Sequence, residues 1–554
     1  MMKRQTSVLR TAAALAVGLG MFWSAPVSAD QIRQIKILSR PQAANPQEFQ
    51  SIQLIAQEWR KLGLDVKVEI MPWEQMADVV WENRDKWDVT GWQMVGRPER
   101  SDPDEIVFNL FHSSTAEKGY NFIGYKNAEF DKVAEAQRRE TDQEKRKDLV
   151  YQAQQILADD QPNLMLVHPR SIFAYDKNVW KASSIVEQSG IGIKNTWTFI
   201  GAEPAGEQKD MILNSADNVI AINPLYISGA TDSWITELIW DRLMRIGPDG
   251  LPKPWAAESV TWVDETTIDV VLKDGLKWHD GQPVTVDDVI FSFTAPQGDE
   301  APMYKPFTKN IKGMEKTGER TVRFTLNNPS AAFLTATLSK INLIPKHIWE
   351  PVIADFATKP ENVEKYQEQT PIGSGPFKFA SWRASEEVVL EANKDHFAAP
   401  KMARWILRIV PNTEAAVGML RKGELNFLSD YSGDPKVLMD VAKEDGDLEV
   451  VATTDIGFRY VAFNNRRPPF DDPAFRKALS TAINRDLIVG AAFKGFAVTS
   501  NSVVSPALGF WHNSAVDKME TGADKAKAML EAAGYKMDGG KLSYPDGKKE
   551  TLGD

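Results

Sequence analysis

Residues 51–73 read SIQLIAQEWRKLGLDVKVEIMPW, and this stretch combines the two signals that decide the fold class. Ile52, Ile55, Trp59 and Leu62 recur at helical spacing. Gly63 then takes the position at which a helix commonly ends. Apolar and polar residues alternate from Leu64 to Ile70, which predicts a strand. A helix that leads directly into a strand is typical of an α/β domain.

The segments around this stretch extend the same mixture. Residues 86–92 predict a second short strand, 128–160 two charged amphipathic helices, and 162–169 a buried strand. From about Asp210 the chain changes to short strands separated by Asp-Gly and Asp-Glu turns, and helices return within 471–534. A chain of 554 residues with this change of texture is expected to form more than one domain.

The first residues predict export from the cytoplasm. Lys3, Arg4 and Arg10 precede or border an apolar run that ends at Trp23, and small residues follow up to Ala29. This pattern indicates a secretory signal peptide over 1–29, too short to span a membrane, and a mature chain that begins near Asp30 in the periplasm. The alternative is a membrane anchor.

Charge and composition exclude several classes of protein. The chain carries a net charge of −11, and removal of the signal with its three positive charges leaves −14, which disfavours nucleic acid and anionic lipid as partners. There is no cysteine, so disulfides, thiolate metal sites and a thiol nucleophile are excluded. No second long apolar stretch follows, so the mature chain is expected to be soluble.

Four stretches carry a resemblance to a known family. They are GLKWHDGQPVTVDDVIFSF (275–293), PIGSGPFKF (371–379), FNNRRPPFDDPAFRKALSTAINRD (463–486) and NFIGYKNAEFDKV (121–133). They resemble marker stretches of the family 5 extracellular solute-binding proteins, the dipeptide, oligopeptide and nickel receptors of ABC importers. KWHDGQPVT with its downstream DDV is the most specific piece.

The resemblance implies a two-lobed periplasmic binding protein fold of the large, three-domain, type II class. Lobe one would combine 170–238 with 370–452. The extra domain, inserted in lobe one, would be 239–369. Lobe two would combine 30–169 with 453–554, so it would contain both ends of the mature chain.

The order of the markers differs from the family order. Residues from Asp30 to about Pro204 resemble the family's C-terminal part, and MILNSADNVIAINPLYISGA at 211–230 resembles its mature N-terminus. The chain therefore resembles a circularly permuted member, in which YPDGKKETLGD (544–554) and DQIRQIKILSRP (30–41) would meet in one sheet. The alternative is a coding region that was wrongly assembled or cut from a longer one.

The sequence offers little from which to build an enzyme. His279 and Asp280 in WHDG could suggest acid–base chemistry, but a turn between a strand and a helix is the better interpretation. The six histidines show no HxH or HExxH spacing, and no nucleophile elbow or phosphate-binding glycine motif is present. We expect no cofactor and no metal; a periplasmic hydrolase or other enzyme on the same fold is the alternative function.

Ten residues are candidates for ligand contact, and their positions rest largely on the resemblance. They are Trp92, Arg97, Arg100, Asp102, Tyr226, Ser228, Thr231, Phe458, Arg459 and Tyr460. Trp92 lies where a predicted strand runs into a polar loop, a common place for ligand contacts. Two arginines intrude into that loop where peptide receptors of the family use an aspartate, and they would favour a carboxylate or phosphate. The loop arginines could instead be solvated, and Tyr226, Ser228 and Thr231 could merely cap a helix.

The function expected from the resemblance is binding without catalysis. Two lobes would close on a small solute, and the closed form would be recognised by an inner-membrane ABC permease. Peptide or peptide-like solutes lead, followed by anionic or metal-chelate solutes, and the protein is expected to act as a monomer.

Overall fold

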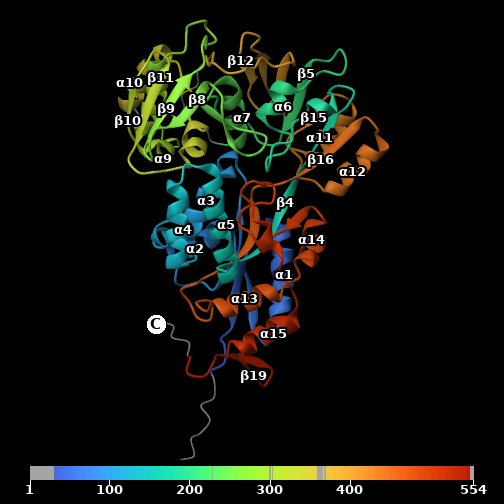
Figure 1. Cartoon of the computed structure of the whole chain (residues 1–554). Coiled ribbons are helices and arrows are strands. Elements are labelled where there is room, and N and C mark those ends of the chain that lie inside the picture. The colour runs from blue at the N-terminus through green and yellow to red at the C-terminus, as the bar shows by residue number, and fades with distance from the viewer. Residues whose placement is uncertain are drawn as a thin grey trace, which may run out of the picture.

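The computed structural model of the protein describes residues 30–226, 229–298, 301, 303–358, 366 and 370–548, so the predicted signal peptide lies outside the described residues. Figure 1 shows two bodies, one above the other, that are joined along the strand β4. The lower body holds the beginning and the end of the described chain, and we call it lobe two. The upper body holds lobe one and, beside it, the extra domain. Helices and strands are mixed throughout, which confirms the predicted α/β class.

One sheet of twelve strands runs through both lobes. Its main path has the order β12-β13-β14-β5-β15-β4-β17-β3-β1-β2, and β16 and β18 also pair with β4. The first half of β4 (Asn163–Asp176) pairs with β17 (Phe458–Phe463) and β18 (Ala497–Thr499). Its second half pairs with β15 (Phe427–Leu428) and β16 (Leu448–Thr454). β4 therefore belongs to both lobes, and the link 455–457 from β16 to β17 forms a second connection.

Lobe two is built on the strands β1 (Ile35–Ser39), β2 (Val66–Ile70) and β3 (Val89–Met94), with β1 parallel to both neighbours. Helices that pack with one buried cluster are α1 (Pro46–Arg60), α13 (Pro473–Thr481), α14 (Arg485–Phe493) and α15 (Ala523–Ala532). Helices that pack with a second cluster are α2 (Trp73–Glu82), α3 (Asp104–Phe111), α4 (Ala128–Arg139) and α5 (Gln143–Asp160). The two clusters draw alternate residues of β17, so they lie on opposite faces of the sheet.

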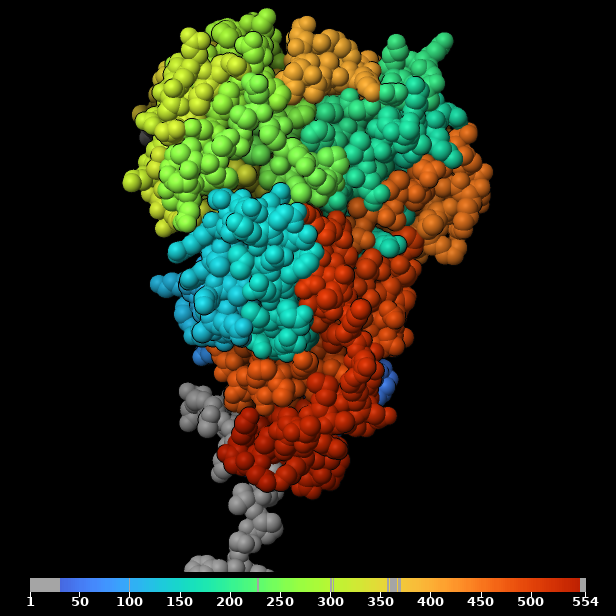
Figure 2. Space-filling model, in the orientation of Figure 1, coloured from blue at the N-terminus to red at the C-terminus, as the bar shows by residue number. Residues whose placement is uncertain are grey.

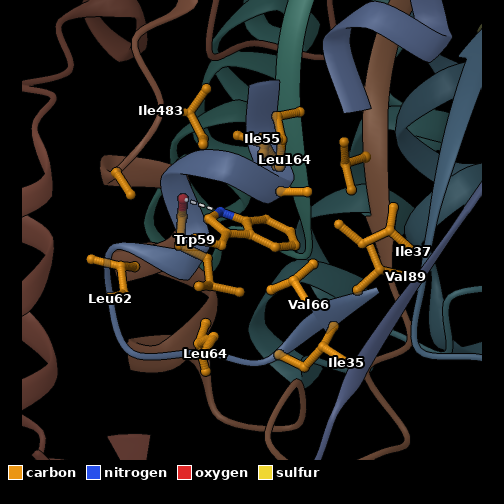
Figure 3. Close-up of a cluster of buried hydrophobic side chains, with 14 of the residues drawn as sticks. Ile35, Ile37, Ile55, Trp59, Leu62, Leu64, Val66, Val89, Leu164 and Ile483 are labelled. Carbon is orange, nitrogen blue, oxygen red and sulfur yellow. Dashed lines mark hydrogen bonds between the residues drawn. The ribbon is translucent and has the colours of Figure 1, made fainter. Parts of the chain in front are cut away.

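The stretch 51–73 forms a helix followed by a strand, as predicted. Asn45 caps α1 by accepting the backbone N–H of Glu48 at 3.0 Å. The helix ends before Gly63, which has a φ of +82° that favours glycine. Trp59 is fully buried, and its indole N–H donates to the Leu479 carbonyl at 3.1 Å (Figure 3). The helix is thereby fixed to α13, which comes from the far end of the chain.

Lobe one continues the same sheet with β5 (Asp210–Ser215), β12 (Phe377–Arg383), β13 (Glu387–Ala392) and β14 (Arg404–Ile409). Its helices are α6 (Thr196–Gly201), α7 (Ala230–Ile239), α11 (Thr413–Arg421) and α12 (Pro435–Glu444). The strands β14, β5 and β15 are parallel, so their carboxyl ends lie at one edge. In open α/β sheets this edge is where ligands commonly bind.

The extra domain contains a separate antiparallel sheet with the order β10-β11-β9-β8. Its strands are β8 (Ala257–Trp262), β9 (Thr267–Leu272), β10 (Ile311–Lys316) and β11 (Thr321–Leu326), next to the hairpin of β6 (Met244–Ile246) and β7 (Pro252–Pro254). Its helices are α8 (Val286–Thr294), α9 (Lys305–Thr308) and α10 (Lys346–Thr358). Thr285 and Asp288 cap the start of α8 in a reciprocal capping box. The predicted domain limits themselves stay a prediction.

Segments from the two ends of the described chain meet in lobe two. The Ile32 N–H donates to the Leu542 carbonyl at 3.0 Å, and the Tyr544 N–H donates to the Asp30 carbonyl at 2.9 Å. These bonds flank an isolated bridge between Gln31 and Ser543, beside the hairpin of β19 (Lys536–Asp538) and β20 (Lys541–Ser543). Of the predicted segment 544–554, Tyr544 pairs with the N-terminal segment, and the other paired residues, Leu542 and Ser543, lie just before it; 549–554 lie outside the described residues. Circular permutation itself stays a prediction.

No helix within the described ranges is both long and apolar enough to cross a membrane.

Candidate functional site

A cavity lies where a loop of lobe two reaches lobe one and the extra domain. Its empty volume is about 560 Å³, part of it open to solvent. It is lined by Pro98, Gln188, Thr196, Trp197, Ser233, Trp234, Glu237, Arg242, Arg245, Ile246, Thr335, Ser339 and Lys340. Pro98 begins the short helix η1 (Pro98–Ser101), which follows β3 in lobe two. The helices α6 and α7, which carry Trp197 and Trp234, belong to the upper body (Figure 1). We call this cavity, together with the facing strand ends of the two lobes, the interlobe cleft.

The lobes touch around the cleft. The Ala331 N–H of the extra domain donates to the Arg138 carbonyl of lobe two at 2.7 Å. In Figure 2 the cyan part of lobe two abuts the green part of the upper body. Lys494 of lobe two lies 2.5 Å from the Asp434 carboxylate of lobe one. The two bodies therefore touch each other beside the cavity, and a molecule in the cavity would contact both.

One wall of the cavity is a buried charge cluster at the end of α7. Glu237 lies 2.9 Å from Arg245 and 3.4 Å from Arg242, and Arg245 also donates to the Glu237 carbonyl at 2.7 Å. Burial opposes the charged form of Glu237, but the two arginines outweigh it and lower the pKa of its carboxyl. Burial also lowers the pKa of Arg245, despite Glu237. With Lys340 nearby, three cations face one carboxylate in this wall.

Two tryptophans form the aromatic part of the cavity. The Trp197 indole N–H donates to the Ile246 carbonyl at 2.8 Å, which fixes that ring against β6. Trp234 lies on α7, and the ammonium of Lys194 lies 5.6 Å from its ring centroid. Flat aromatic walls with a few polar groups are typical of ligand sites.

Three predicted site residues of lobe two lie together. The register of β3 and β17 places Tyr460 opposite Trp92, and the Phe458 ring lies 5.3 Å from Tyr460. All three are buried in the lobe-two core, and burial raises the pKa of Tyr460. Trp92 packs 4.8 Å from Trp73, which is 40% exposed at the start of α2. The aromatic cluster therefore reaches solvent through Trp73.

Arg459 points to the other face of the same sheet. It is paired with Gln93 in the β17–β3 register and is half-buried. Arg40, just beyond the carboxyl end of β1, is close enough to affect its titration, as are Glu48 and Asp455. Burial lowers the pKa of Arg459, and Asp455 only partly opposes this. Arg40 itself is bound to Glu48 in an ion pair.

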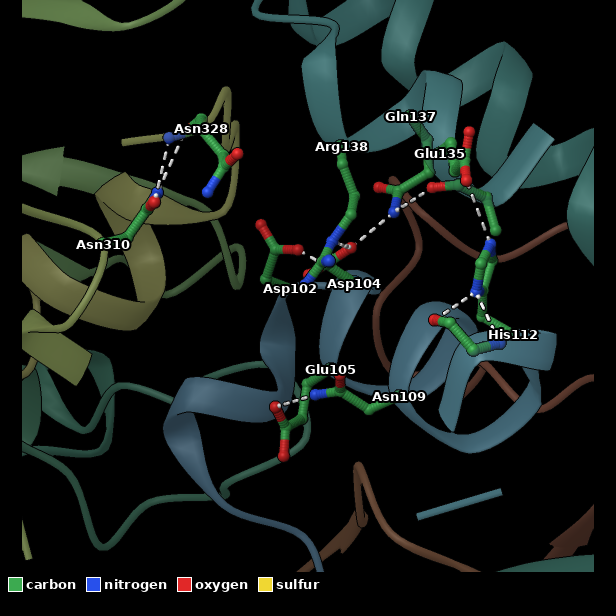
Figure 4. Close-up of polar contacts among 12 residues, drawn as sticks. Asp102, Asp104, Glu105, Asn109, His112, Glu135, Gln137, Arg138, Asn310 and Asn328 are labelled. Atoms are coloured by element: carbon green, nitrogen blue, oxygen red, sulfur yellow. Dashed lines mark hydrogen bonds and ion pairs between the residues drawn. The ribbon is translucent and has the colours of Figure 1, made fainter. Parts of the chain in front are cut away.

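The predicted loop residues have different environments. Arg97 is exposed just before η1, whereas Arg100 is half-buried and donates to the Val95 carbonyl. Asp102 is buried, and its two oxygens accept from Arg146 at 2.6 and 2.7 Å. Its neighbour Asp104 binds Arg138 and Gln137 in the same way (Figure 4). Both oxygens of Asp102 are thus occupied inside lobe two, so its predicted ligand contact has no support from its environment.

The candidates of lobe one lie at the entry to α7. Thr231 is buried, and its hydroxyl lies 3.0 Å from that of Ser215 at the end of β5. Tyr226 is half-buried and packs against the lobe-one core. Ser228 lies outside the described residues. Neither of these two residues caps α7, whose N-cap is Gly229 without a side-chain cap bond; both contact other parts of lobe one instead.

The WHDG motif forms a turn, as the structural interpretation predicted. His279 bonds the Gly375 carbonyl at 3.0 Å through Nε2 and accepts the Gly373 N–H at 3.2 Å through Nδ1. Burial lowers the pKa of His279 to about 4, so the ring is neutral near pH 7. Trp278 is buried below the turn. The motif connects the extra domain to the glycines that precede β12.

Sequence reasoning missed the charged wall of the cavity. The stretch ELIWDRLMRI (237–246) places four charged residues among apolar ones, which is the available signal for buried charge. Lys194, Trp197 and Trp234 carried no comparable signal. Within the part of the chain that the structure describes, no three His, Cys, Asp or Glu side chains are arranged to hold a metal ion.

Comparison with known proteins finds one family and many relatives. The model of the bacterial extracellular solute-binding proteins, family 5 (middle), matches residues 252–552. The oligopeptide-binding protein AppA of Bacillus subtilis is 31% identical over 350 residues, which are 61% of this chain and 62% of that protein. The glutathione-binding protein GsiB of Salmonella typhi is 27% identical over 360 residues, 64% of this chain and 65% of that protein. The chain thus spans less than two thirds of the length of these relatives.

Solved structures with sequence similarity were also found. An oligopeptide-binding protein of Thermotoga maritima has 25% identity and a TM-score of 0.48, covering 62% of this chain and 66% of that one. NikZ of Campylobacter jejuni, in complex with Ni(L-His), has 26% identity and a TM-score of 0.44, with the same coverage.

Proposed function

The chain belongs to the family 5 bacterial extracellular solute-binding proteins, whose model matches more than half of it, and from this membership we propose that it is the substrate-binding component of an ABC importer. It would capture a small solute in the interlobe cleft and deliver it to an inner-membrane permease. The proposal includes export to the periplasm by the predicted signal at 1–29 and a role without catalysis. Peptide-like, anionic and chelated solutes are the candidate classes, since relatives bind oligopeptides, glutathione and Ni(L-His).

The observation that carries this proposal is the origin of the cavity wall. Pro98 comes from lobe two, while Trp197, Trp234 and Glu237 come from the upper body. A molecule in the cavity therefore contacts both lobes, which are connected by β4 and by residues 455–457. Contacts to both lobes exist only in the closed form, so such a ligand shifts the equilibrium toward closure.

The candidate ligand contacts of lobe two fit this proposal unequally. Arg97 and Arg459 have environments from which they could contact a solute. Trp92, Phe458 and Tyr460 are buried, so they would act mainly by supporting the half-exposed ring of Trp73, which packs on Trp92. We no longer propose Asp102 as a ligand contact, because its carboxylate is bound to Arg146. The lining residues of the cavity take its place among the proposed contacts.

Native mass spectrometry of the protein purified from periplasm, without refolding, tests the proposal. We expect one or more small molecules that stay bound in the gas phase and leave on denaturation, in at most stoichiometric amount. Re-addition of the released material to the stripped protein should raise its melting temperature. Turnover of the released molecule by the protein would contradict the proposal and favour the enzyme. A protein without bound or re-bindable solute would contradict it as well.

A further inference from the structure

Two half-buried cations, Lys194 and Arg459, differ from the other described cations whose pKa is lowered by burial. Arg84, Arg245, Arg466, Arg476 and Arg485 each donate hydrogen bonds to a carbonyl, hydroxyl or carboxylate oxygen. Burial likewise lowers the pKa of Lys194 and Arg459. Among the described residues, however, neither of these two side chains has a hydrogen-bond or ion-pair partner. Charges withdrawn from water are usually paired, and these two half-buried cations have only partial access to water.

Lys194 belongs to the lobe-one side of the cleft. Its ammonium lies beside Trp234, a lining residue of the cavity. The carboxylates of Asp217 and Asp430, which follow β5 and β15, act on it only through space. Both strands are parallel and end at the same edge, so Lys194 lies near the edge where lobe one would receive a ligand.

Arg459 belongs to the lobe-two side. It lies near the start of β17, just after the link 455–457 that joins the lobes. In the sheet it is opposite Gln93, near the carboxyl end of β3. Arg40 lies nearby at the end of β1, but Glu48 already neutralises that arginine. Arg459 is half-buried, so its guanidinium is partly open to solvent.

We propose that the solute is an anion, and that its carboxylate or phosphate oxygens supply the missing partners of Lys194 and Arg459, one from each lobe. This inference rests on the proposed function and names the chemical class of its ligand. The cavity wall supports it, because Arg242, Arg245 and Lys340 outnumber the single carboxylate of Glu237. An anion held by cations of both lobes stabilises the closed form, since both charge–charge contacts can exist together only when both lobes are in place.

The test uses Lys194→Gln and Arg459→Gln in the full mature chain, purified from periplasm. Lys312→Gln and Arg139→Gln are matched controls, because both side chains are exposed and lose the same charge. Molecules released on denaturation are separated by anion exchange at pH 7, and their masses are measured by mass spectrometry. We expect an anion from the wild type and both controls, with occupancy at least roughly tenfold lower in the two cleft variants. Its elemental composition distinguishes a carboxylate from a phosphate.

A second measurement covers the case in which the variants fail to accumulate. The stripped wild-type protein is titrated with inorganic phosphate, citrate, glutathione, tri-alanine and tri-alanine amide, and the melting temperature is recorded. We expect stabilisation by an anionic probe and none by tri-alanine amide. A neutral or cationic released molecule, or equal stabilisation by the amide, would overturn the anion inference and leave the proposed function standing. Absence of any bound solute and of any stabilisation would defeat both.

Discussion

The carboxylate of Asp455 lies directly against the backbone of Gly96. A Cβ atom built on Gly96 would overlap Asp455 Oδ1, and the backbone nitrogen of Gly457 lies 2.9 Å from the same point. Gly457 in turn donates its N–H to Asp455 Oδ1 at 2.7 Å. The base of the loop that carries Pro98 into the cleft is therefore packed onto the link between the lobes.

Replacement of Gly96 by alanine should destabilise the protein by about 1–3 kcal/mol, because the added methyl group displaces either the loop or Asp455. Urea denaturation measures this cost. Gly418→Ala in α11 is the matched control: no atom lies near its Cβ position, so we expect a gain of about 0.4–1 kcal/mol. In an Asp455→Ala background the cost of Gly96→Ala should fall. An unchanged cost there would show that the overlap with Asp455 is not its cause.

Asp102 and Arg146 form a buried ion pair with both carboxylate oxygens engaged. Asp102→Asn leaves the guanidinium without its counter-charge, and we expect a loss of about 3–5 kcal/mol in the free energy of unfolding. Lys61→Ala, which removes an exposed pair with Glu58, should cost less than about 1 kcal/mol. If Asp102→Asn were as mild as the control while ligand affinity fell, Asp102 would be a ligand contact after all.

Trp59 is the centre of the lobe-two core beneath β1 and β3 (Figure 3). Trp59→Ala should lower the free energy of unfolding by about 3–5 kcal/mol, because a large buried ring and its bond to Leu479 are lost. Trp73→Ala removes a ring that is 40% exposed and should cost much less. The two midpoints in chemical denaturation compare the variants directly; similar midpoints would contradict the assigned core.

His512 should make stability depend on pH. Its Nδ1 faces the Val504 carbonyl and its Nε2 faces Asp517, both at 2.8 Å, so the doubly protonated ring satisfies both. Burial opposes that charge, but the bonds to Asp517 and Val504 outweigh it and raise the pKa of His512. A raised pKa stabilises the fold fully below the unfolded value of about 6.5, and the gain is lost as the pH rises through the folded value.

We therefore expect the wild type to lose stability relative to His512→Gln as the pH rises above about 6.5, measured by urea denaturation at each pH. Asp517→Asn should also flatten this dependence, since it removes the partner. Equal slopes for the wild type and His512→Gln would contradict the assignment.

The helix and strand of 51–73 could be predicted because periodicity is a local property of the sequence. The spacing of Ile52, Ile55 and Trp59 identifies the buried side of α1. The site could be predicted only in part. Nothing near Asp102 in the sequence indicates that Arg146, 44 residues later, will occupy it. The cavity escaped prediction for the same reason, since only the folded chain brings Pro98 together with Trp234 and Glu237.

The arrangement of β4 has a consequence for the time course of folding. Residues 163–176 form β4, and both halves of this strand pair with residues of 448–463, which lie nearly three hundred positions later. Neither half can complete its hydrogen bonds until those residues have been synthesised. Pairings over such separations form slowly, because loop closure must precede any gain from contacts. A nascent chain that has reached only lobe one still lacks the partners that finish lobe two. During that interval the apolar edges of β4 are exposed to other chains, so the crowded stage of synthesis and export is where aggregation would occur.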